Sequence, residues 1–198
     1  MTRHLGTALR MTLLTAVLLG LVYPLAMTGI AQVIFPGAAN GSMVKADGRV
    51  VGSALIAQAF TQPKYFWPRP SAAGANGYDA MASSFSNLGP TNSTLIDRVA
   101  AAVRAQVKAD PGLRVGAVPV DMVTTSASGL DPDITVANAL AQAPRVAAAR
   151  GLPLTRVVAL VQHNTTGRTL GFIGERRVNV LKLNLALDAV QPGVAGAK

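Results

Sequence analysis

The stretch Thr125–Thr135, TSASGLDPDIT, carries hydroxyls, a glycine and two aspartates within eleven residues. One chemistry that these residue types suggest is that of a serine hydrolase, in which Ser126 or Ser128 would act with Asp131 and His163. Such a nucleophile needs a histidine within hydrogen-bond reach and backbone donors for the oxyanion. No G-x-S-x-G motif accompanies these residues, and His163 stands at an expected helix end, where capping is its simpler role.

Two other chemistries, a phosphate loop and a cation loop, also lack residues that they need. A Walker-type phosphate loop uses several glycines and a lysine, whereas this stretch has Gly129 alone, and the nearest arginine downstream is Arg145. A calcium loop needs about six to eight oxygen ligands, and the glycine and closing glutamate of an EF-hand are missing beside Asp131 and Asp133.

Local physical chemistry favours a structural interpretation over these three chemistries, namely a junction between a strand and a helix. In such a junction a glycine takes a positive φ, short polar side chains accept backbone N–H groups, and a proline starts a turn. A threonine at the end would cap the helix that follows. The residues with these expected roles are Ser128, Gly129, Asp131, Pro132 and Thr135.

The neighbouring elements must position this stretch. Before it, Val118–Val123 resembles a strand, with Asp121 facing away from the apolar side. After it, alanine-rich helical turns are expected over 136–143 and 145–150, separated by Pro144.

The C-terminal part contains two further expected elements. Gly151 should cap the end of the alanine-rich helix, and Thr155 should cap a short helix over 156–163. The run VNVLKLNLAL, residues 178–187, alternates its leucines and predicts a strand, with a helix as the competing interpretation.

The part of the chain before the stretch shows a turn, a loop and a helix. Asp47-Gly48 predicts a hairpin turn. TQPKYFWPRPS, Thr61–Ser71, contains three prolines and is expected to be a packed loop, although its aromatic and arginine side chains also suit an interface. Asn87–Asn92 is expected to be a turn that ends in a helix cap, and the amphipathic helix that follows is expected to end near Asp110. Its apolar stripe is Leu95, Val99, Val103 and Val107.

An uncharged, mainly apolar run of 25 residues, Met11–Phe35, predicts a transmembrane helix, since about 20 residues cross the hydrocarbon core. Pro24 is expected to kink this helix, and the small residues Gly20, Ala26 and Gly29 would let another helix approach closely. A cleaved signal peptide is the alternative, but this run exceeds the roughly 7–15 apolar residues of a signal sequence.

Arg3 and Arg10 precede this span and indicate a cytoplasmic N-terminus by the positive-inside rule, although Lys45 and Arg49 follow it closely. We therefore expect a membrane protein with one pass and a periplasmic or extracellular domain. The fold class is a single N-terminal transmembrane helix followed by one compact α+β domain. The expected divisions are the N-terminus over 1–10, the span over 11–35, a linker over 36–44 and the domain over 45–198.

Composition excludes several classes of protein. Half of the residues are hydrophobic and 14% are charged, so a packed core is expected and disorder is not. The net charge of +9 is scattered, and no basic stripe with interleaved aromatics indicates nucleic-acid binding. Without cysteine, and with only His4 and His163, the chain offers no thiolate chemistry and no structural zinc site, and no metal site is expected.

Six blocks occur in order behind the single span: GSALIAQAF, YFWPRPSAAG, SNLGPTN, DMVTTSASGLDPDIT, APRVAAARGL and FIGERRVNVLKLNLALD. On these blocks the chain resembles the C chain of the Kdp-type potassium-transporting ATPase, and the resemblance covers nearly the full length because the blocks agree in order and spacing. Small departures, at Ala57, Thr135-Val136 and the Gly174–Arg177 turn, change cap or turn chemistry. The residues of interest in these blocks are Arg69, Asn87, Gly89, Pro90, Gly129, Asp131, Pro132, Arg145, Asn179 and Asn184.

The resemblance implies a non-catalytic accessory subunit of an ATP-driven, high-affinity potassium uptake complex. Its partners would be a P-type subunit that hydrolyses ATP, a potassium-channel-like subunit and the lipid bilayer of the bacterial inner (plasma) membrane. The family is described as a catalytic chaperone that raises the ATP affinity of the ATPase subunit, so ATP and potassium would act through the complex. This sequence has no DKTG motif and cannot itself be the pump. If ATP contacts this chain directly, Gln142, Ser126 and Ser128 are the candidate residues, although an exported domain would not meet cytoplasmic ATP.

Overall fold

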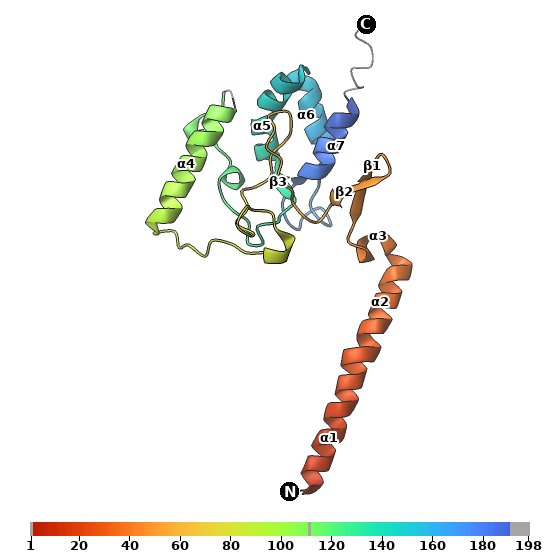
Figure 1. Cartoon of the computed structure of the whole chain (residues 1–198). Coiled ribbons are helices and arrows are strands. Elements are labelled where there is room, and N and C mark those ends of the chain that lie inside the picture. Colours follow the sequence, from red (N-terminus) through yellow and green to blue (C-terminus); the bar gives the residue numbers. More distant parts are fainter. Residues whose placement is uncertain (1, 111, 191–198) are drawn as a thin grey trace. The chain divides into compact units, whose positions relative to one another are not determined.

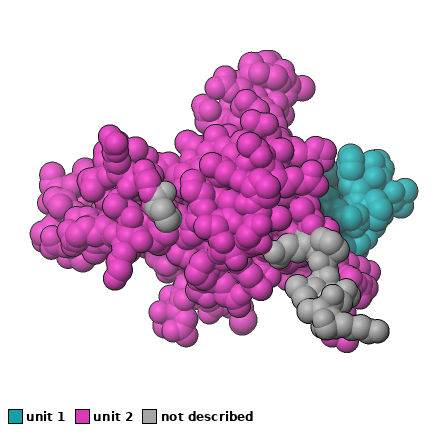
Figure 2. All heavy atoms as spheres, turned by 90° about the horizontal axis from the view of Figure 1, so that it is seen from above, with its two compact units in different colours: residues 1–43 teal, residues 44–198 magenta. Residues whose placement is uncertain are grey.

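A computed structural model describes residues 2–110 and 112–190 of the chain (Figure 1). Contacts divide the chain into two compact units, Met1–Met43 and Val44–Lys198 (Figure 2).

The first unit is helical almost throughout. Its elements are α1 (Thr2–Val17), a π-helical turn η1 (Leu18–Val22), α2 (Tyr23–Ile34) and the short α3 (Pro36–Ala39). By length and composition, the helix from His4 to Ile34 is a candidate membrane span, and none of its most apolar window is buried. This helix is longer than the uncharged run because it also takes in residues 4–10.

Pro24 affects this helix through the turn that precedes it. In η1 the N–H of Tyr23 donates to the carbonyl of Leu18, five residues back, and the chain stays helical on both sides. Proline cannot donate a backbone hydrogen bond, and π-helical turns are a known way for a helix to absorb such a defect. The hydroxyl of Thr28 donates to the carbonyl of Pro24 at 2.8 Å. The helix is therefore irregular directly before Pro24, whereas the kink predicted at Pro24 stays a prediction.

The second unit is a mixed α/β domain with two small sheets. Strands β1 (Met43–Ala46) and β2 (Arg49–Ser53) pair around Asp47 and Gly48, whose positive φ values of 50° and 77° confirm the predicted turn. The second sheet has the antiparallel order β3-β5-β4. Its strands are β3 (Asp133–Thr135), β4 (Thr165–Thr166) and β5 (Arg177–Asn179).

Four helices and three 3₁₀ turns complete this domain. They are η2 (Ala80–Ala82), α4 (Ser93–Ala109), η3 (Val115–Ala117), η4 (Val120–Met122), α5 (Val136–Arg150), α6 (Leu154–His163) and α7 (Val180–Val190). Helices α5, α6 and α7 gather on one side of the domain, and α4 lies apart from them (Figure 1).

The hydrophobic core lies between α5, α6, α7 and the three-stranded sheet. Phe66 from the proline-rich segment is fully buried in it, although that segment has no regular secondary structure. Helix α4 has no buried residue, so its predicted apolar stripe is only half-covered. The other buried members of the core are Ile134, Ala139, Ala143, Val146, Ala147, Val157, Val161, Val178, Val180, Leu183 and Leu187.

The C-terminal run departs from the predicted strand. Only Val178 and Asn179 belong to β5, and α7 begins at Val180. The buried residues Val180, Leu183 and Leu187 follow helical spacing, and the side chain of Asn179 accepts the N–H of Lys182 at the start of the helix. The leucines fit both periods, so the cap and the helical burial decide the outcome.

Three local predictions were also wrong. Val118–Val123 forms no strand, because after Pro119 the chain turns through η4, and Asp121 is buried. Pro144 does not divide α5, which runs through it, because residues before and after it are buried on one face. Helix α6 begins at Leu154 after Pro153 without a side-chain cap, so Thr155 lies inside the helix.

Candidate functional site

The stretch Thr125–Thr135 is held in place by the proline-rich segment. The guanidinium of Arg69 forms an ion pair with Asp131 at 3.1 Å, and its other terminal nitrogen donates to the carbonyl of Thr125 at 3.2 Å. The hydroxyl of Ser71 donates to the carbonyl of Gly129 at 2.6 Å. Two blocks that lie about sixty residues apart in the sequence therefore form one polar junction.

The turn itself uses the residues that the sequence assigned to it. Gly129 has a φ of 69°, and the N–H groups of Leu130 and Asp133 donate to the side chains of Ser128 and Asp131, each at 3.1 Å. At the end of the turn, the hydroxyl of Thr135 accepts the N–H of Asn138 as the cap of α5. The carbonyl of Pro132 accepts the N–H of Val180. These bonds confirm the predicted turn and the predicted helix cap, while the strand that leads into α5 is β3, within the stretch itself, and not Val118–Val123.

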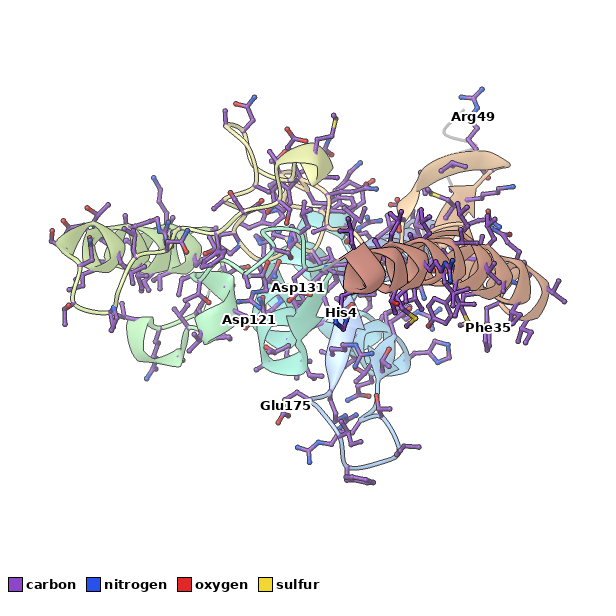
Figure 3. The ribbon with its side chains drawn as sticks, turned by 90° about the horizontal axis from the view of Figure 1, so that it is seen from below. His4, Phe35, Arg49, Asp121, Asp131 and Glu175 are labelled. Atoms are coloured by element: carbon purple, nitrogen blue, oxygen red, sulfur yellow. The ribbon has the colours of Figure 1, made fainter. Side chains whose placement is uncertain are left out.

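Asp121 organises the start of α5, which the sequence did not indicate. Its carboxylate accepts the N–H and hydroxyl of Thr135 at 2.8 and 3.0 Å and the side-chain amide of Asn138 at 3.0 Å. Asp121, Asp131 and Glu175, labelled in Figure 3, line a cavity of about 210 Å³ together with arginines and other residues. Among the described residues, no group of three or more histidines and carboxylates could hold a metal ion.

A groove of about 530 Å³ lies between residues of the SNLGPTN block and residues of the stretch Thr125–Thr135. Asn87 and Gly89 of the SNLGPTN block, Arg98 of α4 and Ser126 all line this groove. Pro90 lies in the turn that leads into α4, closed by a hydrogen bond from the N–H of Asn92 to the carbonyl of Gly89. The groove brings two separate family blocks together.

The proline-rich segment carries few of its own backbone hydrogen bonds, and side chains from α5 and α7 replace them. Gln142, which is 1% exposed, accepts the N–H of Trp67 at 2.7 Å and donates to the carbonyl of Trp67 at 3.0 Å. Asn184 does the same for Phe66, at 2.8 and 3.0 Å. Each amide imitates a neighbouring strand, and the pair holds two consecutive residues of the segment.

Arg145 adds further hydrogen bonds to the same segment, and we call the side chains of Gln142, Asn184 and Arg145 together the polar clamp. The guanidinium of Arg145 donates to the carbonyls of Pro63 and Tyr65 at 2.7 and 3.0 Å, and it lies 3.7 Å from the centre of the Trp67 ring. Its Nε donates to Asp110, the residue that ends α4, at 2.7 Å. This buried ion pair joins α4 to α5.

Burial shifts the pKa of both members of this ion pair. Asp110 is 0% exposed, and this burial raises the pKa of its carboxyl, although the Arg145 guanidinium beside it acts in the opposite direction. Burial likewise lowers the pKa of Arg145, against the effect of Asp110. The Oδ2 atom of Asp110 has no hydrogen-bond partner within the described residues. The pair is therefore sensitive to the loss of either member.

The residues of the hydrolase hypothesis are not brought together. Ser126 is buried and contacts Ser128, with 3.5 Å between their hydroxyl oxygens, while Asp131 pairs with Arg69. His163 lies exposed at the end of α6. Within residues 2–110 and 112–190, no hydrogen bond joins His163 to either serine.

The residues suggested for direct ATP contact occupy different environments. The side-chain oxygen of Gln142 accepts hydrogen bonds from Trp67 and Arg145. Its side-chain nitrogen donates to Trp67 and Asn138, so all of its hydrogen-bonding positions are occupied within the domain. Ser126 is buried, whereas Ser128 is exposed. A nucleotide could engage Gln142 only by displacing bonds that hold the proline-rich segment. Nucleotide contact by these three residues stays a prediction.

The last two residues of interest, Asn179 and Asn184, both have structural contacts. Asn179 donates to the carbonyl of Ala54 at 2.9 Å and to Asp133 at 3.2 Å, and it caps α7. The sequence signals that were missed are the isolated polar residues Asp110, Asp121 and Asn138. A lone polar residue between apolar ones can mark a buried hydrogen bond.

Gln142→Glu should lower the free energy of unfolding by about 1–2 kcal/mol, because the two amide donors to Trp67 and Asn138 are lost. Closer pairing of the new carboxylate with Arg145 would offset part of the loss. Denaturant unfolding of the full chain measures the change, and Gln162→Glu at an exposed position of α6 is the matched control. A fall in the ATP affinity of the complex with unchanged stability would instead support nucleotide contact.

These features define a class of protein: within the described residues, one candidate membrane span is followed by a small mixed α/β domain whose buried polar side chains bind backbone groups and one another. The family model described as "K+-transporting ATPase, c chain" matches residues 5–189. A Potassium-transporting ATPase KdpC subunit from Gemmatimonas aurantiaca is 57% identical over 190 residues, covering 96% of this chain and 94% of the relative. Proteins of that name from Caulobacter vibrioides and Mycobacterium bovis are 59% and 55% identical, covering 100% and 95% of this chain and 99% of each relative. The chain belongs to the KdpC family of potassium-transporting ATPase subunits.

Proposed function

We propose that this chain is a non-catalytic accessory subunit of an ATP-driven potassium uptake complex. Family membership supports a role as a subunit of such an ATPase. The observation that supports a non-catalytic role is that polar side chains of the blocks shared with the family form hydrogen bonds to the backbone of the domain itself. Arg69, Gln142, Arg145 and Asn184 all hold backbone groups of the domain. The sequence also has no DKTG motif to accept a phosphoryl group.

The partners in this proposal are an ATP-hydrolysing P-type subunit and a potassium-channel-like subunit. We place the N-terminus in the cytoplasm and the domain outside, with residues 11–35 as the span, 36–44 as the linker and 45–198 as the domain. With the domain outside, a rise in the ATP affinity of the pump would pass through the assembled complex. The candidate span supports the membrane anchor because it is long enough to cross a bilayer, and Arg3 and Arg10 before it support the cytoplasmic N-terminus.

Affinity purification of the tagged full chain from mildly solubilised membranes tests this proposal. We expect an ATPase chain and a channel-like chain to copurify, and the complex without this chain to need more ATP for half-maximal hydrolysis. A tagged single-span protein of unrelated sequence is the control. Recovery of the chain alone, under conditions that keep the other two together, would contradict the proposal.

A further inference from the structure

The loop between β4 and β5 presents apolar side chains to solvent. Every residue from Thr166 to Arg177 is exposed, and the tip carries Leu170, Phe172 and Ile173, which are 79%, 72% and 50% exposed. We call residues 168–177 the β4–β5 finger. Figure 3 shows the loop that carries Glu175 extending from the body of the domain. Large apolar side chains that cluster at a protruding tip usually mark a contact surface.

The finger is a formed hairpin and not a loose loop. Thr169 and Ile173 exchange backbone hydrogen bonds, each at 2.9 Å, so the two sides of the tip are paired. Leu170 has a φ of 55°, a left-handed conformation that is costly for leucine. The chain therefore accepts local strain at the tip to hold a leucine that the described residues leave 79% exposed. Strain of this kind commonly marks a functional segment.

Charge at the root of the finger complements an anionic surface. Three arginines and one glutamate give residues 168–177 a net charge of +2. Arg168 pairs weakly with Glu175 at 3.4 Å, Arg177 pairs with Asp133 at 2.9 Å, and Arg176 makes no ion pair within the described residues. Apolar residues at the tip with arginines behind them match the boundary between lipid tails and phosphates.

The connection between the candidate span and the second unit is short, so the domain stays near any bilayer that the span crosses. The candidate span ends at Ile34 and the second unit begins at Val44, so nine residues, 35–43, connect them. Even fully extended, such a tether spans only about 30 Å. We propose that the β4–β5 finger inserts its apolar tip into the interface of an anionic phospholipid bilayer, with its arginines on the phosphates. This inference rests on the helix crossing a membrane, not on the potassium complex.

Site-specific fluorescence on the full chain in nanodiscs tests the finger, because the chain contains no cysteine. Phe172→Cys would carry an environment-sensitive dye, and Met81→Cys, at a position that is 97% exposed, is the matched control. Discs of phosphatidylcholine alone are compared with discs that also contain phosphatidylglycerol. Iodide quenches dye in water, and a spin-labelled lipid quenches dye in the interface.

In discs with phosphatidylglycerol we expect the dye at 172 to be several-fold less sensitive to iodide than the dye at 81, and to be quenched by the spin-labelled lipid. Arg176→Glu combined with Arg168→Glu should reverse both effects. Equal iodide access at the two positions would overturn the proposal. Shielding that arises only when the other subunits are added would overturn it in favour of a protein contact. Either result leaves copurification, and hence the proposed function, unaffected.

Discussion

Arg145→Ala is expected to lower the free energy of unfolding by about 3–5 kcal/mol, the typical cost of leaving one member of a buried ion pair without its partner. Asp110 is fully buried and receives its hydrogen bond from the Nε of Arg145 at 2.7 Å. The substitution also frees the carbonyls of Pro63 and Tyr65 and uncovers the ring of Trp67. The loss should therefore reach both α4 and the proline-rich segment.

Denaturant unfolding of the full chain measures this change, with Trp67, the only tryptophan, as the fluorescent reporter. Arg156→Ala removes an exposed arginine from α6 and is the matched control. We expect the control to change stability by less than about 0.5 kcal/mol. Similar losses in the two variants would show that the ion pair is not a major source of stability.

The effect of Arg145→Ala should depend on pH. Burial raises the pKa of Asp110 above its ordinary value of 3.8, so the folded state holds this proton more tightly than the unfolded state. The stabilising contribution of the protonated carboxyl is fully present below pH 3.8 and is lost as the pH rises through the pKa of the folded state. Without Arg145 the burial is unopposed, so the variant should regain part of its lost stability, relative to the original chain, as the pH falls.

Gly129→Ala is expected to cost about 2–4 kcal/mol, combining a left-handed backbone with a steric clash. The φ of Gly129 is 69°, and a Cβ atom there would lie 2.8 Å from the carbonyl oxygen of Ser84 and 2.9 Å from the backbone nitrogen of Ala73. Backbone atoms cannot move aside as a flexible side chain can. The turn would have to open, which separates the stretch 125–135 from the proline-rich segment.

The variant Gly151→Ala distinguishes the cost of a left-handed backbone from the cost of a steric clash. Gly151 has a similar φ of 63°, but no atom lies within 4 Å of a Cβ placed there. It should therefore show only the backbone cost, about 1–2 kcal/mol. Thermal unfolding of both variants, followed by recovery of the partner subunits in a pull-down, makes the comparison. Equal losses at the two glycines would mean that the contact with Ser84 and Ala73 contributes nothing.

Elements that depend on neighbouring residues were predictable. The Asp47-Gly48 turn, the Asn92 cap of α4, the Thr135 cap of α5 and the left-handed Gly151 all follow from local conformational preferences. The single span and the mixed α/β class also follow from apolar patterning. For the turn and the caps, the groups that decide the structure lie within a few residues of one another, and for the span the composition of one continuous run is sufficient.

The polar clamp could not be predicted, because its partners lie far apart in the sequence. Gln142 is 75 residues from Trp67, and Asn184 is 118 residues from Phe66. Nothing near Asp121 indicates that it will accept bonds from Thr135, fourteen residues later. In the same way, the leucines of α7 fit a strand and a helix equally well, and the buried core decides between them.

The clamp also sets the order in which the chain can fold during synthesis. The proline-rich segment leaves the ribosome more than a hundred residues before Asn184, the residue that receives Phe66. Contacts between such distant residues form late, because a long loop must close first. Phe66 and Trp67 therefore lack these partners until α7 and α5, respectively, have been made. The domain would thus mature only after the last helix has been translated, which gives chaperones a defined interval in which to bind the aromatic segment.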